Sequence, residues 1–411
     1  MVVDDRGVAV ATDSAAAAVA LEAAVLALVC HRADLASRID QALALDPTLA
    51  LAHLLRGFAL SLQARPVYDP VVERVLTAVG RPGGREGVLA AALAALDRDD
   101  RRVAAAMLRR HLAAVPHDLL ALKLHQAITF QDGDGRQMVE VSAAVLPYWT
   151  EDQPGFGHVL GLHAFALEEA GALDLAERVG RRAVERVPYD PWAVHAVAHV
   201  YEMRGEPALG LAWLGTERQC RIGCGPFQRH LDWHEALFLI ALGRREAALE
   251  VYDRAVWPSA TPEYREVANA VSLLWRLESA GLNVGDRWQG VADAAETLAG
   301  ECRLGFAHVH ALVALWRAGV PLPAAPAPKH AGVIAAAIAN LSAGKAQIAA
   351  RQLVAAHEQW QPLGGSHAQR DVFLRLAIDT ATAVGRRDLA DEVRRTRAKR
   401  FQTQPPLDCA A

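Results

Sequence analysis

Helical segments in this chain end in glycines that recur at a nearly constant interval. Gly133, Gly171, Gly205 and Gly243 each follow a stretch with helical hydrophobic spacing, and they are separated by 38, 34 and 38 residues. An interval of about 34 residues is the length of one helical hairpin, two helices with their turns. Because one hairpin cannot bury its apolar faces alone, successive hairpins must stack. The glycine interval therefore predicts a stack of helical hairpins.

One repeat can be followed in segment 157–190. Small residues stand where its two helices should meet, Ala164 in the first and Ala176 and Ala183 in the second, and Pro188 ends the repeat. Hydrophobic residues make up 52% of the chain and aromatic residues only 6%, a mix typical of closely packed helices. No segment has a convincing strand pattern. We predict an all-α fold, a tetratricopeptide-like superhelix of helical hairpins (an α-solenoid), with an irregular all-α fold as the alternative.

The predicted array divides the chain into five segments. Residues 1–14 form a disordered N-terminus, and the hairpin array with a central histidine-rich groove spans residues 15–320. The Pro/Ala-rich stretch 321–329 is a linker. Helices over residues 330–400 complete the array, and residues 401–411 form a disordered tail.

The charge and the cysteine content of the chain indicate which classes of partner and which cellular compartment to expect. The formal net charge is −4 and no long basic run occurs, so we expect neither nucleic acid nor a membrane as a partner. The N-terminus carries two acids before any apolar run, unlike a secretory signal. Five scattered cysteines, an odd number, indicate a reduced protein, which we expect to be cytoplasmic. A homo-oligomer is left open.

Two imidazoles and a carboxylate share one face of the helix predicted over residues 191–203. His195, His199 and Glu202 fall within roughly 60° of arc when each residue turns the helix by about 100°. Asp190 should cap the start of this helix. Each polar group costs roughly 2–7 kcal/mol if it is buried without a partner. A metal, a ligand, water or neighbouring side chains must therefore compensate.

A second imidazole pair, His230 and His234, lies on the first helix of the next repeat, again four residues apart. Imidazoles at this spacing suit divalent transition metals. The predicted metal ligands are His195, His199, His230 and His234. Three alternatives stay open: metal-free acid–base chemistry, a polar pocket that binds without reacting, and buried histidines satisfied by backbone groups or carboxylates.

Further side chains are expected to bind a substrate around this centre. Ser366 and Gln369 form a predicted capping box, which leaves Arg370 for the groove or for an anionic group of a substrate. The Cys220–Cys224 pair stands too close to the second imidazole pair for a zinc finger. The full predicted substrate-binding set is His163, Glu168, Trp192, Trp233, Asn269, His310, His367 and Arg370.

Several strings between about residues 160 and 373 are distinctive: GLHAFALEEAG, DPWAVHAVAHVYEMRG, HLDWHEALF, SLLWRLESAGLNVGDRW, GFAHVHALVA and GGSHAQRDVF. They resemble the tetratricopeptide repeat protein 38 family. The resemblance implies a tetratricopeptide-like fold and a histidine-rich inner groove, and it supplies no reaction. The chain departs from the family pattern at Leu231, Asn269, Ala307 and His308, where the family usually has Asn, Asp and Asn-Asp. These departures put a shared substrate or a shared metal in question.

These features predict a groove that binds and transforms a small-molecule ligand by hydrolysis, elimination or isomerisation. The predicted catalytic residues are His195, His199, Glu202, His230 and His234, with the imidazoles as ligands or proton shuttles and Glu202 as base or orienting group. A divalent transition metal is the candidate cofactor. The alternative is a non-catalytic tetratricopeptide scaffold for protein or peptide binding, whose groove should present Lys, Arg and Asn.

Overall fold

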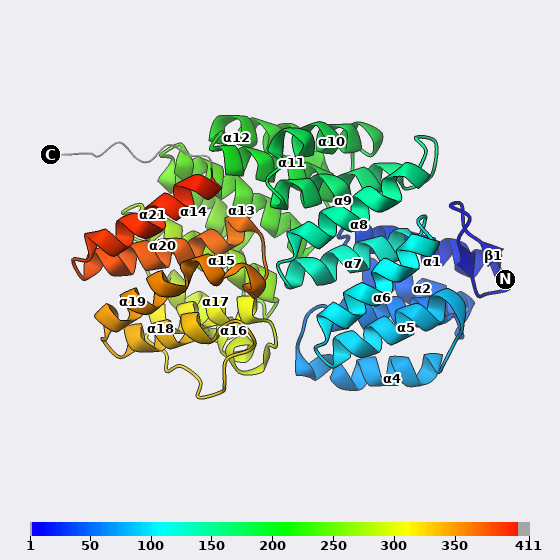
Figure 1. Ribbon diagram of the computed structural model, residues 1–411, viewed down its shortest axis with the longest axis horizontal. Coiled ribbons are helices and arrows are strands. Elements are labelled where there is room, and N and C mark those ends of the chain that lie inside the picture. The colour runs from blue at the N-terminus through cyan, green and yellow to red at the C-terminus, as the bar shows by residue number, and fades with distance from the viewer. Residues whose placement is uncertain (1, 402–411) are drawn as a thin grey trace. The chain divides into compact units, whose positions relative to one another are not determined.

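The structure, a computed structural model, describes residues 2–401. Within these residues it contains 21 α-helices and one pair of short strands (Figure 1). The predicted class, an all-α stack of tetratricopeptide-like helical hairpins, is confirmed. The helices are α1 Ala15–Val29, α2 Leu35–Leu45, α3 Ala50–Ser61, α4 Asp69–Val79, α5 Gly84–Asp97, α6 Arg101–Ala114, α7 Leu119–Gln131, α8 Gly135–Val145, α9 Phe156–Glu169, α10 Leu173–Arg186, α11 Pro191–Arg204, α12 Pro207–Thr216, α13 Pro226–Ala241, α14 Arg245–Val251, α15 Tyr264–Ser279, α16 Arg287–Glu301, α17 Gly305–Arg317, α18 Gly332–Ser342, α19 Ala346–Ala356, α20 His367–Ala383 and α21 Arg387–Arg400.

The four periodic glycines follow the ends of α7, α9, α11 and α13, as their interval predicted. Gly133, Gly171, Gly205 and Gly243 have φ angles between 68° and 82°. This left-handed conformation lets the chain turn sharply after a helix, and residues with a Cβ rarely adopt it. Each glycine therefore fixes the point at which the first helix of a hairpin stops and the second can fold back.

The chain divides into two compact units. Unit 1 comprises the chain up to Val197 together with Glu217–Gln228, and unit 2 comprises Ala198–Thr216 together with the chain from Arg229 onward. This division differs from the predicted array over residues 15–320, because the boundary falls inside α11.

Inner and outer helices of a hairpin are clearly distinct in unit 1. Every residue of α9 is buried, because α9 packs against both α8 and α10. The outer helix α10 buries only one stripe, which contains Leu173, Ala176, Gly180 and Ala183. At Gly180 a Cβ atom would lie 2.6 Å from Cγ2 of Val197. The small residue thus lets α10 approach α11 closely.

In unit 2, α15 is the inner helix around which the others gather. It packs against α14, α16, α17 and α20, and the residues from Glu266 to Leu277 are all buried. The α18–α19 and α20–α21 hairpins follow the segment 321–329, which contains no helix. The polar side chains that α15 carries into this core are therefore placed to build a site.

The predicted disorder of residues 1–14 is wrong for residues 2–14, where two strands pair antiparallel, β1 Val2–Val3 with β2 Ala9–Val10. The hairpin is anchored from outside its own sequence. Arg6 forms ion pairs with Asp4 and with Glu22 of α1, and Val10 is buried. The predicted tail over residues 401–411 lies outside the described residues apart from Phe401.

The predicted capping box at the start of α20 is present and gives a test of the fold. Ser366 Oγ accepts a hydrogen bond from the amide of Gln369 at 3.2 Å, and Gln369 Oε1 accepts one from the amide of Ser366 at 3.0 Å. We expect Ser366→Ala to lower the free energy of unfolding by about 1 kcal/mol, because the buried amide of Gln369 loses its side-chain acceptor. Ser366→Thr keeps the hydroxyl and should lose less. Urea unfolding measures both, and equal stabilities of the two variants would contradict the assignment.

Candidate functional site

Helix α11 starts at a buried carboxylate, as the sequence predicted. Asp190 Oδ1 accepts a hydrogen bond from the amide of Trp192 at 2.9 Å, which satisfies a free N–H of the first turn. Its other oxygen, Oδ2, lies 2.8 Å from Nδ1 of His158 on α9. Asp190 is 1% exposed. One carboxylate therefore both caps α11 and pairs with an imidazolium of the neighbouring helix.

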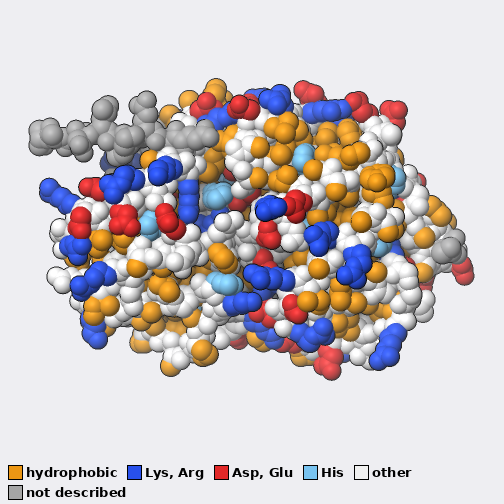
Figure 2. All heavy atoms as spheres, in the orientation of Figure 1, with side chains coloured by type: hydrophobic (Ala, Val, Ile, Leu, Met, Phe, Trp, Pro, Cys, Tyr) orange, Lys and Arg blue, Asp and Glu red, His pale blue; other side chains and the backbone are white. Residues whose placement is uncertain are grey.

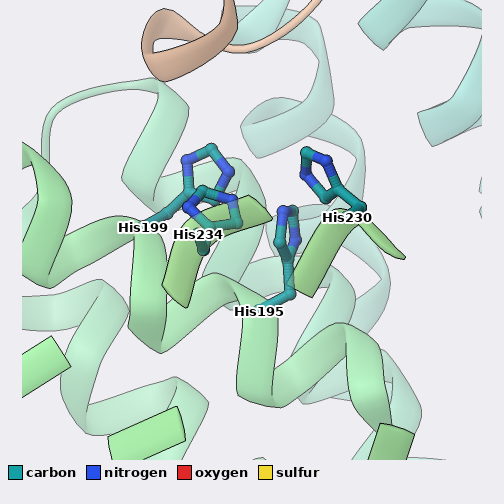
Figure 3. Close-up of side chains that lie close together, drawn as sticks. All are labelled: His195, His199, His230 and His234. Carbon is teal, nitrogen blue, oxygen red and sulfur yellow. The ribbon is translucent and has the colours of Figure 1, made fainter. Parts of the chain in front are cut away.

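Three of the predicted imidazoles come together within unit 2. His199 lies on α11, and His230 and His234 lie on α13 (Figure 3). The ring centroids of His199 and His234 are 4.6 Å apart, and those of His230 and His234 are 4.9 Å apart. A ligand nitrogen from each lies within 4.8 Å of the other two. We call these three residues the histidine cluster.

The orientation of His230 is fixed by a neighbour that the sequence also singled out. Nδ1 of His230 lies 3.0 Å from Oδ1 of Asn269, so the nitrogen carries the proton and donates it. Burial lowers the pKa of His230 to about 3, which keeps the ring neutral. Trp233, with an interplanar angle of 16°, stacks on the same imidazole. Asn269 and Trp233 therefore contact the histidine cluster, and the substrate-binding role predicted for them stays a prediction.

The half-buried Glu202 lies on α11 among charged groups of unit 2. Burial raises the pKa of its carboxyl, while the guanidinium of Arg276 opposes that shift and Asp371 adds to it. His199 is close enough to contribute to the same balance. Glu202 thus lies between the histidine cluster and a buried ion-pair network, in which Asp371 contacts Arg276 and Arg397.

His195 and Trp192 belong to an aromatic group in unit 1. The ring of His195 lies 5.3 Å from that of Phe165 and 5.1 Å from that of Phe227, measured between centroids. Trp192 packs against Phe165, and the ammonium of Lys123 lies 4.0 Å from the indole centroid. His195 precedes His199 by one turn on the same face of α11. Its predicted metal-binding role stays a prediction.

The remaining predicted substrate-binding residues make local contacts inside the helical stack. His163 pairs with Ser142 Oγ at 2.9 Å, and its burial lowers its pKa to about 4. Glu168 is fully buried on α9. His310 bonds through Nδ1 to the carbonyl of Phe306 at 2.7 Å. The substrate-binding role predicted for these residues stays a prediction.

Arg370 and His367 support the loop before α20. The Arg370 guanidinium donates to the carbonyl oxygens of Gly364 and Gly365 and lies 3.2 Å from Nδ1 of His367. Arg370 is 2% exposed. The guanidinium thus supports the loop through the chain's own carbonyls, and its predicted contact with an anionic substrate group stays a prediction.

Cys220 and Cys224 are buried thiols. Burial raises the pKa of Cys220 to about 12 and that of Cys224 to about 11, and Sγ of Cys224 donates to the carbonyl of Cys220 at 3.0 Å. Metal binding needs thiolates. Burial therefore favours the protonated thiol at both positions, and the sequence argument against a zinc finger stays a prediction.

Unit 2 contains an open groove that the sequence did not predict. It has a volume of about 650 Å³ and is formed where α15, α17, α18, α19 and α20 meet. Two of its lining residues, Trp275 and Trp316, lie 5.9 Å apart between ring centroids. We call it the tryptophan groove. Its lining residues are Trp275, Glu278, Ser279, Gly281, Leu282, Asn283, Trp316, Arg317, Leu341, Ala346, Asp379, Thr380 and Ala383.

Hydrogen bonds hold the polar wall of the tryptophan groove in place. Asp379 Oδ2 accepts one from Nε1 of Trp275 at 3.0 Å and one from Oγ of Ser279 at 2.7 Å. Arg317 pairs with Glu278 at 2.9 Å and lies 5.7 Å from the ring centroid of Trp316. The only sequence signal was a repeated Trp-Arg dipeptide near the ends of two inner helices, at residues 275–276 and 316–317.

Surface charge and helix length bear on the expected partners. On the face shown in Figure 2, Lys and Arg side chains are interspersed with Asp and Glu. No helix within residues 2–401 has the length and apolar character needed to cross a membrane.

Comparison with solved structures gave distant matches. No protein-family model matches the chain. A solved structure described as "Structure of Naa15/Naa10 bound to HypK-THB" matches with 14% sequence identity and a TM-score of 0.26. The match covers 94% of this chain and 64% of the other, so the present chain spans less than two thirds of the chain that it matches.

The small-molecule partner predicted from the sequence is wrong. The imidazoles that were predicted to bind the small molecule are buried: His199 and His234 are 0% exposed, and His230 is 8% exposed. Their rings pack against one another. The catalytic roles of these residues stay predictions.

The ion pair beneath α11 gives a pH prediction. Burial opposes the charged form of His158, but the Asp190 carboxylate outweighs it and raises the pKa of His158 to about 10. The pair therefore stabilises the fold fully below pH ~6.5, which is the pKa of a histidine in the unfolded chain. Its contribution is lost as the pH rises through the folded-state pKa, with a slope of about 1.4 kcal/mol per pH unit.

The measurement is urea unfolding between pH 6.5 and 10, with His158→Gln as the comparison. The glutamine variant keeps a side-chain donor and loses the titration, so its free energy of unfolding should fall less steeply over this range. Parallel pH profiles for the two proteins would show that the pair does not carry this linkage.

Proposed function

We propose that this protein is a non-catalytic tetratricopeptide-like scaffold that binds a segment of a protein partner in the tryptophan groove. The observation that supports this most directly is the convergence of two indoles and two carboxylates from different helices on one open groove of about 650 Å³. A volume of this size takes a few side chains of a bound segment. Such grooves are a usual binding surface of helical-repeat proteins.

The composition of the groove suits a protein ligand. Tryptophan and arginine are enriched among residues that dominate the binding energy of protein interfaces, and here Trp275, Trp316 and Arg317 lie together. Leu341, Ala346 and Ala383 add apolar surface, and Asn283 is also present. Arginine and asparagine were the residue types expected of a peptide-binding groove.

The charge of the groove points to a basic residue in the bound segment. Glu278 and Asp379 are two carboxylates against one guanidinium, that of Arg317, so the lining has a net charge of −1. A carboxylate has room for about four hydrogen bonds, and Asp379 can accept further donors beside its bonds to Trp275 and Ser279. We expect the partner segment to place a Lys or Arg on Asp379 and an aliphatic side chain against Trp316.

The test is to pan a phage-displayed library of random peptides against the immobilised full-length protein, and to measure the affinity of enriched peptides by fluorescence anisotropy. Trp316→Ala should weaken binding roughly 10- to 30-fold, since a central aromatic contact contributes about 2 kcal/mol or more. Asp379→Asn keeps the side-chain shape and should weaken only the peptides that contain a basic residue.

Tyr189→Ala is the matched control, because it removes an aromatic ring that is 69% exposed and outside the groove. It should bind as the wild type does. The proposal is refuted if no peptide is enriched, or if enriched peptides bind Trp316→Ala and Asp379→Asn with wild-type affinity while circular dichroism shows all variants folded.

We also propose membership of the tetratricopeptide repeat protein 38 family. The support is the set of strings between about residues 160 and 373, which include the segments around His195, His230 and Asn269. One of these strings, SLLWRLESAGLNVGDRW, also supplies six lining residues of the tryptophan groove: Trp275, Glu278, Ser279, Gly281, Leu282 and Asn283.

A further inference from the structure

We infer that His199, His230 and His234 form a structural binding site for one divalent transition metal ion, with zinc as the best fit. The site is distinct from the tryptophan groove and does not depend on the proposed function. All three residues belong to unit 2. Three imidazoles are a common ligand set for zinc.

The distances between the rings allow joint coordination. A zinc ion bound by nitrogens at about 2.0–2.1 Å in tetrahedral geometry holds them roughly 3.3 Å apart. One nitrogen of each cluster histidine already lies within 4.8 Å of the others. Small rotations about χ1 and χ2 close that difference. The two residues on α13 are four positions apart, so they present their rings on the same face of one rigid helix.

The contact of His230 with Asn269 prepares the ring for metal binding. Because Oδ1 of Asn269 can only accept, Nδ1 of His230 carries the hydrogen, and the lone pair remains on Nε2. Histidines that bind metals usually donate their other nitrogen in this way to a carboxylate, an amide or a carbonyl, which fixes tautomer and orientation. Asn269 is 1% exposed and comes from a different helix, α15.

Two other buried histidines of unit 2 differ from the cluster in their contacts. His308 Nδ1 bonds to the carbonyl of Ala299 at 3.1 Å, and His357 bonds to the carbonyl of Val354 through one nitrogen and to Thr396 Oγ1 through the other. Each is an isolated ring next to a main-chain acceptor. The cluster instead assembles three rings around one point, with the half-buried Glu202 one turn after His199 to offset positive charge.

Burial defines the role of the ion. His199 and His234 are 0% exposed and His230 is 8% exposed. Three imidazoles leave the fourth tetrahedral position of a zinc ion to a water molecule, and the burial of all three rings restricts access of a substrate to it. The ion would therefore fasten α11 to α13 and hold the polar centre of unit 2, and a fall in stability is expected on its removal.

The experiment uses the full chain, expressed without a histidine tag and freed of metal by dialysis against a chelator. Zn²⁺ or Co²⁺ is then added, excess ion is removed, and bound metal is counted by mass spectrometry. We expect one ion per chain, a higher Tm with Zn²⁺, and the visible absorption of tetrahedral Co²⁺.

Variants separate this site from adventitious binding. His199→Ala and His234→Gln should lose the bound ion, and Asn269→Ala should weaken affinity roughly 10- to 100-fold. His308→Ala, a buried histidine outside the cluster, is the matched control and should keep one ion. If His199→Ala fails to fold, His234→Gln and Asn269→Ala still decide the question. The inference is overturned if the wild type retains no ion, or if the cluster variants retain as much as His308→Ala.

Discussion

Buried carboxylates held by cationic partners are the interactions on which the helical stack most depends. Asp118 and Asp371 are 0% and 2% exposed, so each would be strongly destabilising alone. Asp118 accepts two hydrogen bonds from Arg85 and one from His111, and Asp371 is bound by Arg375 among others. Burial opposes ionisation of both carboxyls, yet these cations outweigh it and lower the pKa of each below its ordinary value. Since each partner comes from another helix or another turn, satisfying the charge also fixes how the helices cross.

Short sequence patterns predicted most of the fold. The glycine spacing predicted where the first helix of each hairpin ends, and Ser366 with Gln369 predicted the start of a helix. Both patterns could be identified in the sequence because a helix end and a capping box each involve only a few neighbouring residues. The N-terminal hairpin was missed for the opposite reason. Its strands are two residues long, and its anchor Arg6 pairs with Glu22, which no short pattern reveals. The division of α11 between two units likewise depends on contacts that are distant in sequence.

The candidate sites were predictable to different extents. The spacing of four residues was enough to predict that His230 and His234 lie on one face of a helix, and the same spacing pattern in the preceding inner helix pointed to His199. Whether rings from separate helices meet depends on the crossing of those helices, which the sequence does not state. The tryptophan groove draws residues from five helices between Trp275 and Ala383, so no segment of it carries a recognisable motif. A surface built in this way becomes visible only in three dimensions.

The stacking of Lys123 on Trp192 has a consequence for chemical labelling. Only four lysines occur in the chain, and Lys123, the one in unit 1, is 5% exposed. The other three, Lys329, Lys345 and Lys399, are exposed and belong to unit 2. Acylating reagents, amine cross-linkers and enzymes that conjugate ubiquitin to lysine would therefore mark one half of the molecule and leave the lysine of the other half untouched.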